Sequence, residues 1–220
     1  MIEAYVRTFV QALRRKSKVN FILSLRNGSK LLDVGCGNNS PSICKALRPD
    51  IYYVGLDIGD YNQVRCPSGV ADEYIIAAPE TFIQTIATFE HRFDALISSH
   101  NLEHCAMPYS VLIAMLKTLK PGGRIYLAFP CSASISFPSR RGLNFYDDNT
   151  HKELLEMILV EETIKTEGFT IDFVTERHRP LLLKLIGLVL EPLSFLSRRV
   201  MVGTWELYGF ESIIWATKRL

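Results

Sequence analysis

The cysteines of this chain lack the spacings that mark a disulfide framework or a zinc site. There are five of them, an odd number, and no two form a Cys-x-x-Cys pair. Scattered cysteines of this kind are typical of reduced thiols in a cytosolic protein. We therefore predict no metal site and a cytoplasmic location.

Long apolar runs and a strong charge of one sign are absent as well. No uninterrupted apolar run reaches the roughly 18 residues that a membrane-spanning helix needs. The N-terminus opens Met-Ile-Glu and soon becomes basic, so we expect no signal peptide. The formal net charge is only +2, which is too small to indicate a nucleic-acid partner.

The sequence also lacks internal repeats and low-complexity tracts. Hydrophobic residues make up 48% of its 220 residues and charged residues 22%, a balance typical of a folded globular domain. This length fits one domain with a full-sized core. We predict a single domain over residues 1–220, with a leading amphipathic helix in 1–26 and a helical insertion at 178–206.

Short apolar runs alternate with helix-like segments along the whole chain. The predicted strands are residues 30–34, 51–57, 73–77, 93–99, 124–129, 170–174 and 210–217. The predicted helices between them are residues 40–48, 79–89, 111–119 and 151–167. This alternation predicts an α/β fold, a doubly wound, mostly parallel sheet of seven strands.

Proline, glycine and serine suggest where several of these helices begin and end. Ser40 is expected to cap a helix whose first residue is Pro41. Lys120-Pro-Gly-Gly123 is expected to stop a helix before the next strand. Pro192 is expected to break any helix in the insertion. The loop 131–150 and the insertion 178–206 lie outside a minimal sheet-and-helix core.

The most informative feature is a glycine turn, Lys30-Leu-Leu-Asp-Val-Gly-Cys-Gly-Asn38, followed by the strand Tyr53-Val-Gly-Leu-Asp57. Gly35 and Gly37 let the backbone turn sharply and approach a ligand closely. Asp57, at the tip of the second strand, is placed to accept hydrogen bonds from a ribose diol. These positions predict an adenosine-bearing cofactor.

Two common nucleotide motifs are missing at this turn. A dinucleotide fingerprint requires glycine where Ser40 stands, and Asp33, two residues before the first glycine, is no part of that fingerprint. The G-x-x-x-x-G-K-[ST] sequence of a phosphate-binding loop is absent from the turn. The turn alone therefore leaves the choice of cofactor open.

Four segments in order narrow that choice. They are Leu31-Leu-Asp-Val-Gly-Cys-Gly37, Val54-Gly-Leu-Asp57, Phe93-Asp-Ala-Leu-Ile-Ser-Ser-His-Asn-Leu-Glu-His104 and Leu119-Lys-Pro-Gly-Gly-Arg-Ile-Tyr-Leu127. Over residues 30–130, and again over 209–218, the chain resembles the class I S-adenosylmethionine-dependent methyltransferases. The resemblance implies a Rossmann-like domain whose cofactor is S-adenosyl-L-methionine and whose product is S-adenosyl-L-homocysteine.

The resemblance also implies which residues bind the cofactor. Asp33, Gly35 and Gly37 would shape the methionine and ribose side of the pocket, and Asp57 would hold the ribose hydroxyls. The remaining implied cofactor residues are Cys36, Ile58, Ser98, Ser99 and His100. For Cys36, no base stands at a sensible spacing, so its thiol is interpreted as packing rather than as a nucleophile.

Two positions depart from the family pattern. Asn39 stands where a third glycine is frequent, so we expect a tighter turn or a slightly displaced ligand. After the third strand, family members often have an acidic residue that binds the amine of adenine. In this chain the only candidate in that segment is Glu80. These departures keep open a module that holds the cofactor without turnover.

Methyl transfer needs a base only if the acceptor must lose a proton. His104, Asp148 and His151 are the catalytic candidates, and the first of them equally fits a structural role. Asp148 and His151 are spaced to meet at the carboxyl edge of the sheet. Alternatively, Asp148 or the next residue caps a helix that begins at Thr150.

The methyl acceptor is the least defined part. The Asp-x-x-His element resembles methyltransferases of sugar and cell-surface glycan pathways, so we expect O-methylation of a small or lipid-linked sugar or glycan precursor. A quinone-like lipid, another small metabolite and a protein are alternatives. The apolar residues 181–199 are compatible with a lid, with a helical hairpin on the core, or with peripheral contact at the inner membrane surface, where Arg198 and Arg199 would face lipid head groups.

Overall fold

The computed structural model describes residues 16–220. Most of the predicted leading helix lies outside the described residues, and only α2 (Lys18–Leu23) falls within its range. This short helix begins after Ser17, whose hydroxyl accepts the backbone N–H of Asn20. That bond satisfies one of the free donors at the helix N-terminus.

Seven strands form one sheet, in the order β3-β2-β1-β4-β5-β7-β6. The strands are β1 (Lys30–Val34), β2 (Tyr52–Asp57), β3 (Glu73–Ile76), β4 (Phe93–Ser99), β5 (Leu119–Pro130), β6 (Phe169–Thr175) and β7 (Glu211–Lys218). Only β7 runs antiparallel to its neighbours, and the other pairs are parallel. The predicted doubly wound α/β fold is confirmed.

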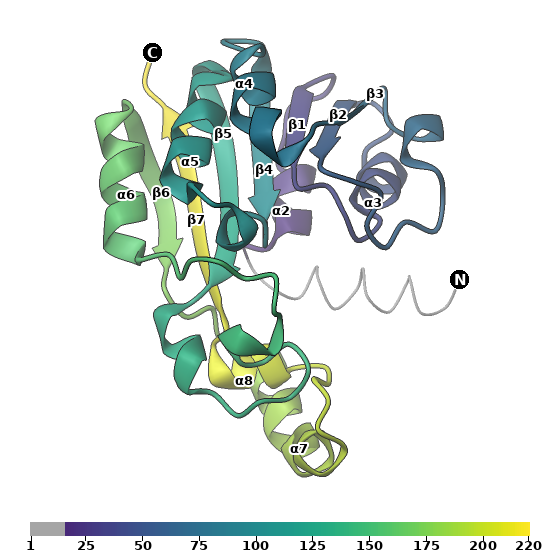
Figure 1. Ribbon diagram of the computed structural model, residues 1–220, viewed down its shortest axis with the longest axis vertical. Helices are drawn as coiled ribbons and strands as arrows, with labels where there is room; N and C mark the ends of the chain where they lie inside the picture. The colour runs from purple at the N-terminus through teal and green to yellow at the C-terminus, as the bar shows by residue number, and fades with distance from the viewer. Residues whose placement is uncertain (1–15) are drawn as a thin grey trace.

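Helices cover both faces of the sheet (Figure 1). These helices are α2, α3 (Ser40–Leu47), α4 (Phe82–Ala87), α5 (Pro108–Lys117) and α6 (Met157–Thr166). Two further helices, α7 (Leu181–Ser197) and α8 (Thr204–Tyr208), lie beyond the end of the sheet. One buried apolar cluster joins the sheet to α4, α5 and α6, and the other joins it to α2 and α3. Buried on both faces, the central strands are mostly apolar, as parallel strands are.

Several predicted boundaries differ from the structure, and four of these differences have a clear structural reason. The N-cap of α3 is Asn39 rather than Ser40, whose hydroxyl bonds to side chains instead. The helix predicted from His151 begins only at Met157. Residues 120–123 belong to the start of β5, where the register with β4 shifts. Helix α7 continues through Pro192, because Leu183 and Ser194 are buried on either side of the proline.

Two segments fold together beyond the carboxyl end of the strands, and we call residues 131–150 and 180–208 the cap. In Figure 1 the cap, with α7 and α8, lies at the end of the molecule opposite the C-terminus. The buried guanidinium of Arg140 joins the two segments through an ion pair of 2.7 Å to Glu191 and a hydrogen bond to Tyr208. The indole of Trp205 donates a second link, of 2.8 Å, to the carbonyl of Gly142.

No helix among residues 16–220 combines the length and the apolar character required to cross a bilayer.

Candidate active site

Three parallel strands bring the predicted cofactor residues to one edge of the sheet. Val34, the last residue of β1, is paired with Leu56 on one side and with Ser98 on the other. The residues that follow these strands therefore meet at the carboxyl edge. The N–H of Gly35 donates to the carbonyl of Leu56 at 2.8 Å, which holds the glycine turn beside the tip of β2.

Gly35 is required by both its conformation and its surroundings. Its φ is +76°, a region that other residues rarely adopt. A Cβ placed there would come within 2.5 Å of the Cβ of Asn101. Asn101, which follows β4, is a residue of this edge that the sequence prediction did not include. It lay inside the segment that carries the family resemblance, but no pattern marked its contact with the turn.

The carboxylate of Asp57 faces the second glycine of the turn. A Cβ on Gly37 would lie only 3.7 Å from Asp57 Oδ2. The other carboxylate oxygen accepts the N–H of Ile58 at 2.8 Å. Burial raises the pKa of Asp57, while backbone N–H donors, among them those of Ile58 and Gly37, oppose the rise. The carboxylate of Asp57 thus lies beside the backbone of Gly37. This is where the sequence predicts an acceptor for the hydroxyls of a ribose.

Asp33 is fully buried behind the turn and is held by three side chains. Its Oδ2 accepts Lys18 Nζ at 3.0 Å, Tyr53 Oη at 2.8 Å and the hydroxyl of Ser40. Its Oδ1 has no hydrogen-bond partner among residues 16–220. A buried carboxylate oxygen without a donor is costly. It therefore fits a site that receives a donor from a ligand or from water.

The position of the missing third glycine is occupied by Asn39, which has a left-handed backbone conformation. Asn39 has φ +61°, and asparagine tolerates this left-handed region better than most residues. Its side-chain oxygen accepts the N–H of Val64 at 2.6 Å. The segment 61–64 is further attached by the bond from Asn38 N–H to the carbonyl of Tyr61. Hydrogen bonds to segment 61–64 therefore hold the end of the turn, at the position where the family often has a third glycine.

The other predicted cofactor residues differ in how far their side chains are exposed to solvent. The thiol of Cys36 is fully buried, and burial strongly raises its pKa, so it is a packing group and not a nucleophile. Ser98 is buried and donates to the carbonyl of Val34 at 3.1 Å. Ser99 is half-buried, and Ile58 is 43% exposed. Among these four side chains, Ile58 offers the open apolar surface of the edge.

His100 is held between two carboxylates. One ring nitrogen lies 3.1 Å from Glu103 Oε1 and the other 2.9 Å from Glu211 Oε1. The ring also stacks on Phe210 and lies against Trp205. Burial alone would lower the pKa of His100, but the bonds to both glutamates raise it to about 10. His100 is therefore a charged link between β4 and β7 and has no free nitrogen to serve as a base.

The predicted catalytic residues do come together. The rings of His104 and His151 lie with their centroids 4.7 Å apart. The hydroxyl of Thr150 lies 2.9 Å from His104 Nδ1 and 2.5 Å from Asp148 Oδ1. Asp148 thus reaches His104 through Thr150, an arrangement that the spacing of Asp148 and His151 did not predict.

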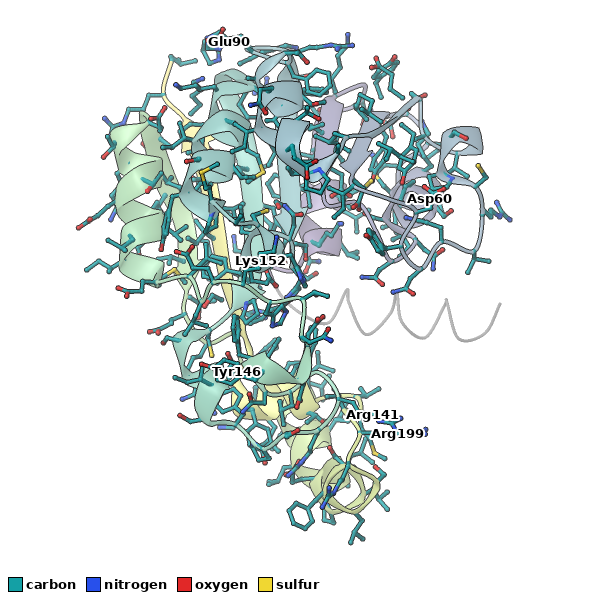
Figure 2. All side chains as sticks on the ribbon, viewed as in Figure 1. Asp60, Glu90, Arg141, Tyr146, Lys152 and Arg199 are labelled. Atoms are coloured by element: carbon teal, nitrogen blue, oxygen red, sulfur yellow. The ribbon has the colours of Figure 1, made fainter. Side chains whose placement is uncertain are left out.

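The segment that carries His151 is held by the backbone of the segment that carries His104. The carbonyl of Glu103 accepts the N–H of Lys152 at 2.8 Å and that of Glu153 at 3.3 Å. Figure 2 shows Lys152 where the sheet meets the cap. No helix begins at Thr150, so the interpretation of Asp148 as a helix cap is wrong. Its carboxylate instead accepts the N–H and the hydroxyl of Thr150 within a turn.

A shallow groove between α5 and α6 lies apart from this edge. It is lined by Tyr109, Ile113, Leu159, Glu162, Thr163, Thr166 and Glu167. None of the predicted site residues borders it, and its walls bring no catalytic or cofactor candidates together. The carboxyl edge remains the candidate site.

Comparison with known proteins agrees with this geometry. Residues 5–212 match the family model described as a methyltransferase domain. The chain belongs to this methyltransferase family. The cofactor predicted from the sequence, S-adenosylmethionine, is therefore confirmed at the level of the family.

Individual relatives of this chain are distant. It is 26% identical over 129 residues to the 27-O-demethylrifamycin SV methyltransferase of Amycolatopsis mediterranei, covering 54% of this chain and 47% of the relative. It is 32% identical over 118 residues to the ubiquinone biosynthesis O-methyltransferase of Pseudomonas syringae, covering 50% and 49%. The chain spans about half the length of these curated relatives.

A solved structure supports the fold over nearly the whole chain. The SAM-dependent methyltransferase from Archaeoglobus fulgidus superimposes with a TM-score of 0.60. The match covers 96% of this chain and 93% of that one, at 18% identity. At this low sequence identity, the match supports the fold and gives no information about the methyl acceptor.

The residues at the carboxyl edge fit the cofactor. Asp57 is an acceptor beside a bare glycine, as a ribose diol requires. The orphaned oxygen of Asp33 fits a donor from the methionine side of the ligand or from a bridging water. Glu80 is exposed on the short turn after β3 and makes no contact that assigns it to adenine.

Proposed function

We propose that the protein transfers a methyl group from S-adenosylmethionine to a hydroxyl oxygen of a lipid-linked acceptor. When bound, the cofactor supplies a methyl group on a positively charged sulfur. Its transfer forms a C–O bond, breaks the C–S bond and leaves S-adenosylhomocysteine. Asp33, Asp57 and the glycine turn hold the cofactor, and positioning supplies much of the rate.

The observation that carries an oxygen acceptor is the pair His104 and His151. An aliphatic hydroxyl, like water with its pKa of about 15.7, holds its proton tightly at neutral pH and needs a group that favours the ionised oxygen. The pair is half-buried beside the carboxyl edge, and both Nδ1 atoms are already engaged by oxygens. The Nε2 atoms are then the groups available to act on the hydroxyl.

A lipid-linked acceptor is supported by the surface of α7. Eight large apolar side chains of this one helix are 50% exposed or more: Leu181, Leu182, Leu185, Leu188, Val189, Leu193, Phe195 and Leu196. Soluble surfaces rarely gather so many. The exposed cations Lys184, Arg198 and Arg199 lie within or directly after the helix. Apolar groups flanked by cations suit the surface of an anionic bilayer.

The acceptor we place first is a sugar or glycan precursor on a lipid carrier. A second candidate is the phenol of a quinone-like lipid, favoured by the name of the Pseudomonas syringae relative. A phenol ionises near pH 10, so it needs less help from the His104–His151 pair than a sugar hydroxyl does. A small metabolite, a protein acceptor or a module that only holds the cofactor are the remaining alternatives.

Two measurements test this function. Calorimetry with S-adenosylmethionine and S-adenosylhomocysteine tests the cofactor, and no heat with either in a folded sample would refute it. Release of S-adenosylhomocysteine is then measured with lipid-linked sugars and with polyprenyl phenols. Turnover with a sugar acceptor that falls in His104→Ala and His151→Ala supports the proposal. Binding without turnover over the whole panel favours a cofactor-holding module.

The contribution of α7 is tested by sedimentation with vesicles. Binding is expected to phosphatidylglycerol vesicles and to be weaker to phosphatidylcholine vesicles. Val189→Glu and Leu196→Glu are expected to abolish it, because each places a charge on the apolar face. Ile158→Glu, at a site 63% exposed on α6, is the matched control and keeps it. Concentration-dependent self-association that the α7 variants abolish would assign this face to a second copy instead.

A further inference from the structure

Glu103, His104 and His151 form a compact group of metal-binding side chains. One ligand atom of each, a ring nitrogen or a carboxylate oxygen, lies within 4.8 Å of the other two. The segments that carry them are joined by the hydrogen bonds from Lys152 and Glu153 to the carbonyl of Glu103. The group is therefore built by the fold and not by chance contact of loose surface side chains.

The hydrogen bonds of both histidines leave the same nitrogen free. Thr150 gives its hydroxyl proton to Asp148, so its oxygen accepts from Nδ1 of His104. Nδ1 of His151 lies 2.6 Å from the carbonyl of Phe145 and also donates. In the neutral rings the lone pairs are then on Nε2. Histidines that bind metals are commonly oriented in this way by an oxygen on the other nitrogen.

Glu103 adds an independent observation. It is fully buried, and its Oε1 is engaged by His100. Its Oε2 is buried and has no hydrogen-bond partner among residues 16–220. Burying a carboxylate oxygen without a partner costs folding free energy, and a bound metal ion would offset that cost.

We propose that Glu103, His104 and His151 bind a divalent transition-metal ion. Two imidazole nitrogens and one carboxylate oxygen suit Zn²⁺ and its first-row neighbours, whereas Mg²⁺ and Ca²⁺ prefer oxygen ligands. Three protein ligands leave a coordination position open, as in catalytic zinc sites. The scattered cysteines predict no thiolate site, but they say nothing about a site made of histidine and glutamate.

The open position gives the ion a role in the reaction, and only this step rests on the proposed function. A cation held by the His104–His151 pair attracts the oxygen of the acceptor hydroxyl and favours its ionised form, while the proton leaves to solvent. The pair then acts on the acceptor through the ion.

The test is calorimetry of Zn²⁺ and, separately, Mg²⁺ into protein treated with a chelator, without cofactor or acceptor. The background is Cys66→Ser, because Cys66 is exposed and thiols are zinc ligands, so it would add a competing site. Expected is one Zn²⁺ per chain and at least 10-fold weaker binding of Mg²⁺. Glu103→Gln and His151→Ala are expected to remove the Zn²⁺ heat. Circular dichroism and thermal unfolding check that each variant is folded.

Two further variants keep the result decisive. Thr150→Val retains the shape of the side chain but removes the group that orients His104, so Zn²⁺ affinity is expected to fall about 10- to 100-fold. His91→Ala, a histidine at the opposite edge of the sheet, is expected to change nothing. Absence of Zn²⁺ binding, or binding that the Glu103, Thr150 and His151 variants leave unchanged, overturns the proposal. S-adenosylmethionine titrated into the same samples shows whether the cofactor site has failed independently.

Discussion

The side chain of Asn101, two residues beyond the end of β4, lies directly over Gly35, the first glycine of the turn, and leaves no room for a Cβ there. Gly28 has a similar φ, +69° against +76° at Gly35, but nothing lies within 4 Å of where its Cβ would be. The two glycines thus share the backbone requirement and differ only in their surroundings.

Alanine at each position separates these two effects. Gly28→Ala is expected to cost about 1 kcal/mol of folding free energy, from the left-handed backbone alone. Gly35→Ala is expected to cost about 2–4 kcal/mol, because the clash with Asn101 adds to the same strain. Urea denaturation of both variants measures the difference. Equal costs would contradict the contact between Asn101 and the turn.

Asp57→Ala is expected to weaken S-adenosylmethionine binding by about 1.5–3 kcal/mol, or roughly 10- to 150-fold. The reason is the loss of a charged acceptor beside the backbone of Gly37. Asp172→Ala, at the β6 edge of the sheet, is the control and is expected to bind normally. Within residues 16–220, the side chain of Asp172 forms a hydrogen bond only with Thr217. Calorimetry compares the two, and unchanged affinity in Asp57→Ala would place the ribose elsewhere.

The same carboxylate predicts a pH dependence. Burial raises the pKa of Asp57 above its ordinary value, which is about 3.9. Because the ionised form is the acceptor, affinity is expected to decline as the pH falls through this raised pKa, earlier than for an ordinary aspartate. Asp57→Asn removes the titrating group and flattens this decline. A wild-type profile that matches that of Asp57→Asn between pH 7 and 4 would contradict the assignment.

The glycine turn and Asp57 are predictable from the sequence because their roles are local. A strand tip, a turn that needs glycine and an acid one strand away all leave a pattern over a few residues. Lys18 and Glu211 leave none, since they reach Asp33 and His100 from opposite ends of the chain. Only the folded sheet brings such residues together.

The wrong boundaries have the same cause. Pro192 disfavours a helix locally, yet the contacts of α7 with α8 hold the helix on both sides of it. At His151 the helical pattern is overruled by hydrogen bonds from the following residues to Glu103. Helix propensity predicts a boundary poorly where tertiary contacts favour a different local structure.

The loop of the cap depends on Asp147. Its Oδ2 accepts the N–H groups of Arg140, Gly142, Leu143 and Asn144 at 2.9–3.0 Å. Burial alone would raise the pKa of Asp147, but the hydroxyl of Ser139 and these N–H groups lower it to about 2. The pKa of Asp147 is therefore lower in the folded protein than in the unfolded chain, where it is near 3.9. The ionised carboxylate stabilises the fold fully at pH values above 3.9, and this stabilisation is lost as the pH falls toward 2.

Asp147→Asn is therefore expected to cost about 1–2 kcal/mol at pH 7. The difference between wild type and variant is expected to shrink between pH 4 and pH 2, where the wild-type carboxylate becomes protonated. Urea denaturation at several pH values measures it. A difference independent of pH would show that the charge of Asp147 is not what holds the loop.

The ion pair of Arg140 and Glu191 tests whether the cap is one unit. The guanidinium is 3% exposed, so Glu191→Gln leaves a buried charge without its partner and is expected to cost about 2–4 kcal/mol. Removing both charges, as Arg140→Met with Glu191→Gln, is expected to cost less than the sum of the single changes. The exposed pair Glu161 and Lys165 on α6 is the control, where Glu161→Gln costs about 0.3–0.5 kcal/mol.

Urea denaturation gives the coupling energy, and limited proteolysis reports where the structure opens. Because Arg140 joins residues 131–150 to α7, Glu191→Gln is expected to expose both cap segments to protease together while the sheet stays protected. S-adenosylmethionine binding is expected to persist, since the pair lies in the cap and not at the glycine turn. Additive single changes, or cleavage confined to one segment, would mean that the two halves of the cap fold independently.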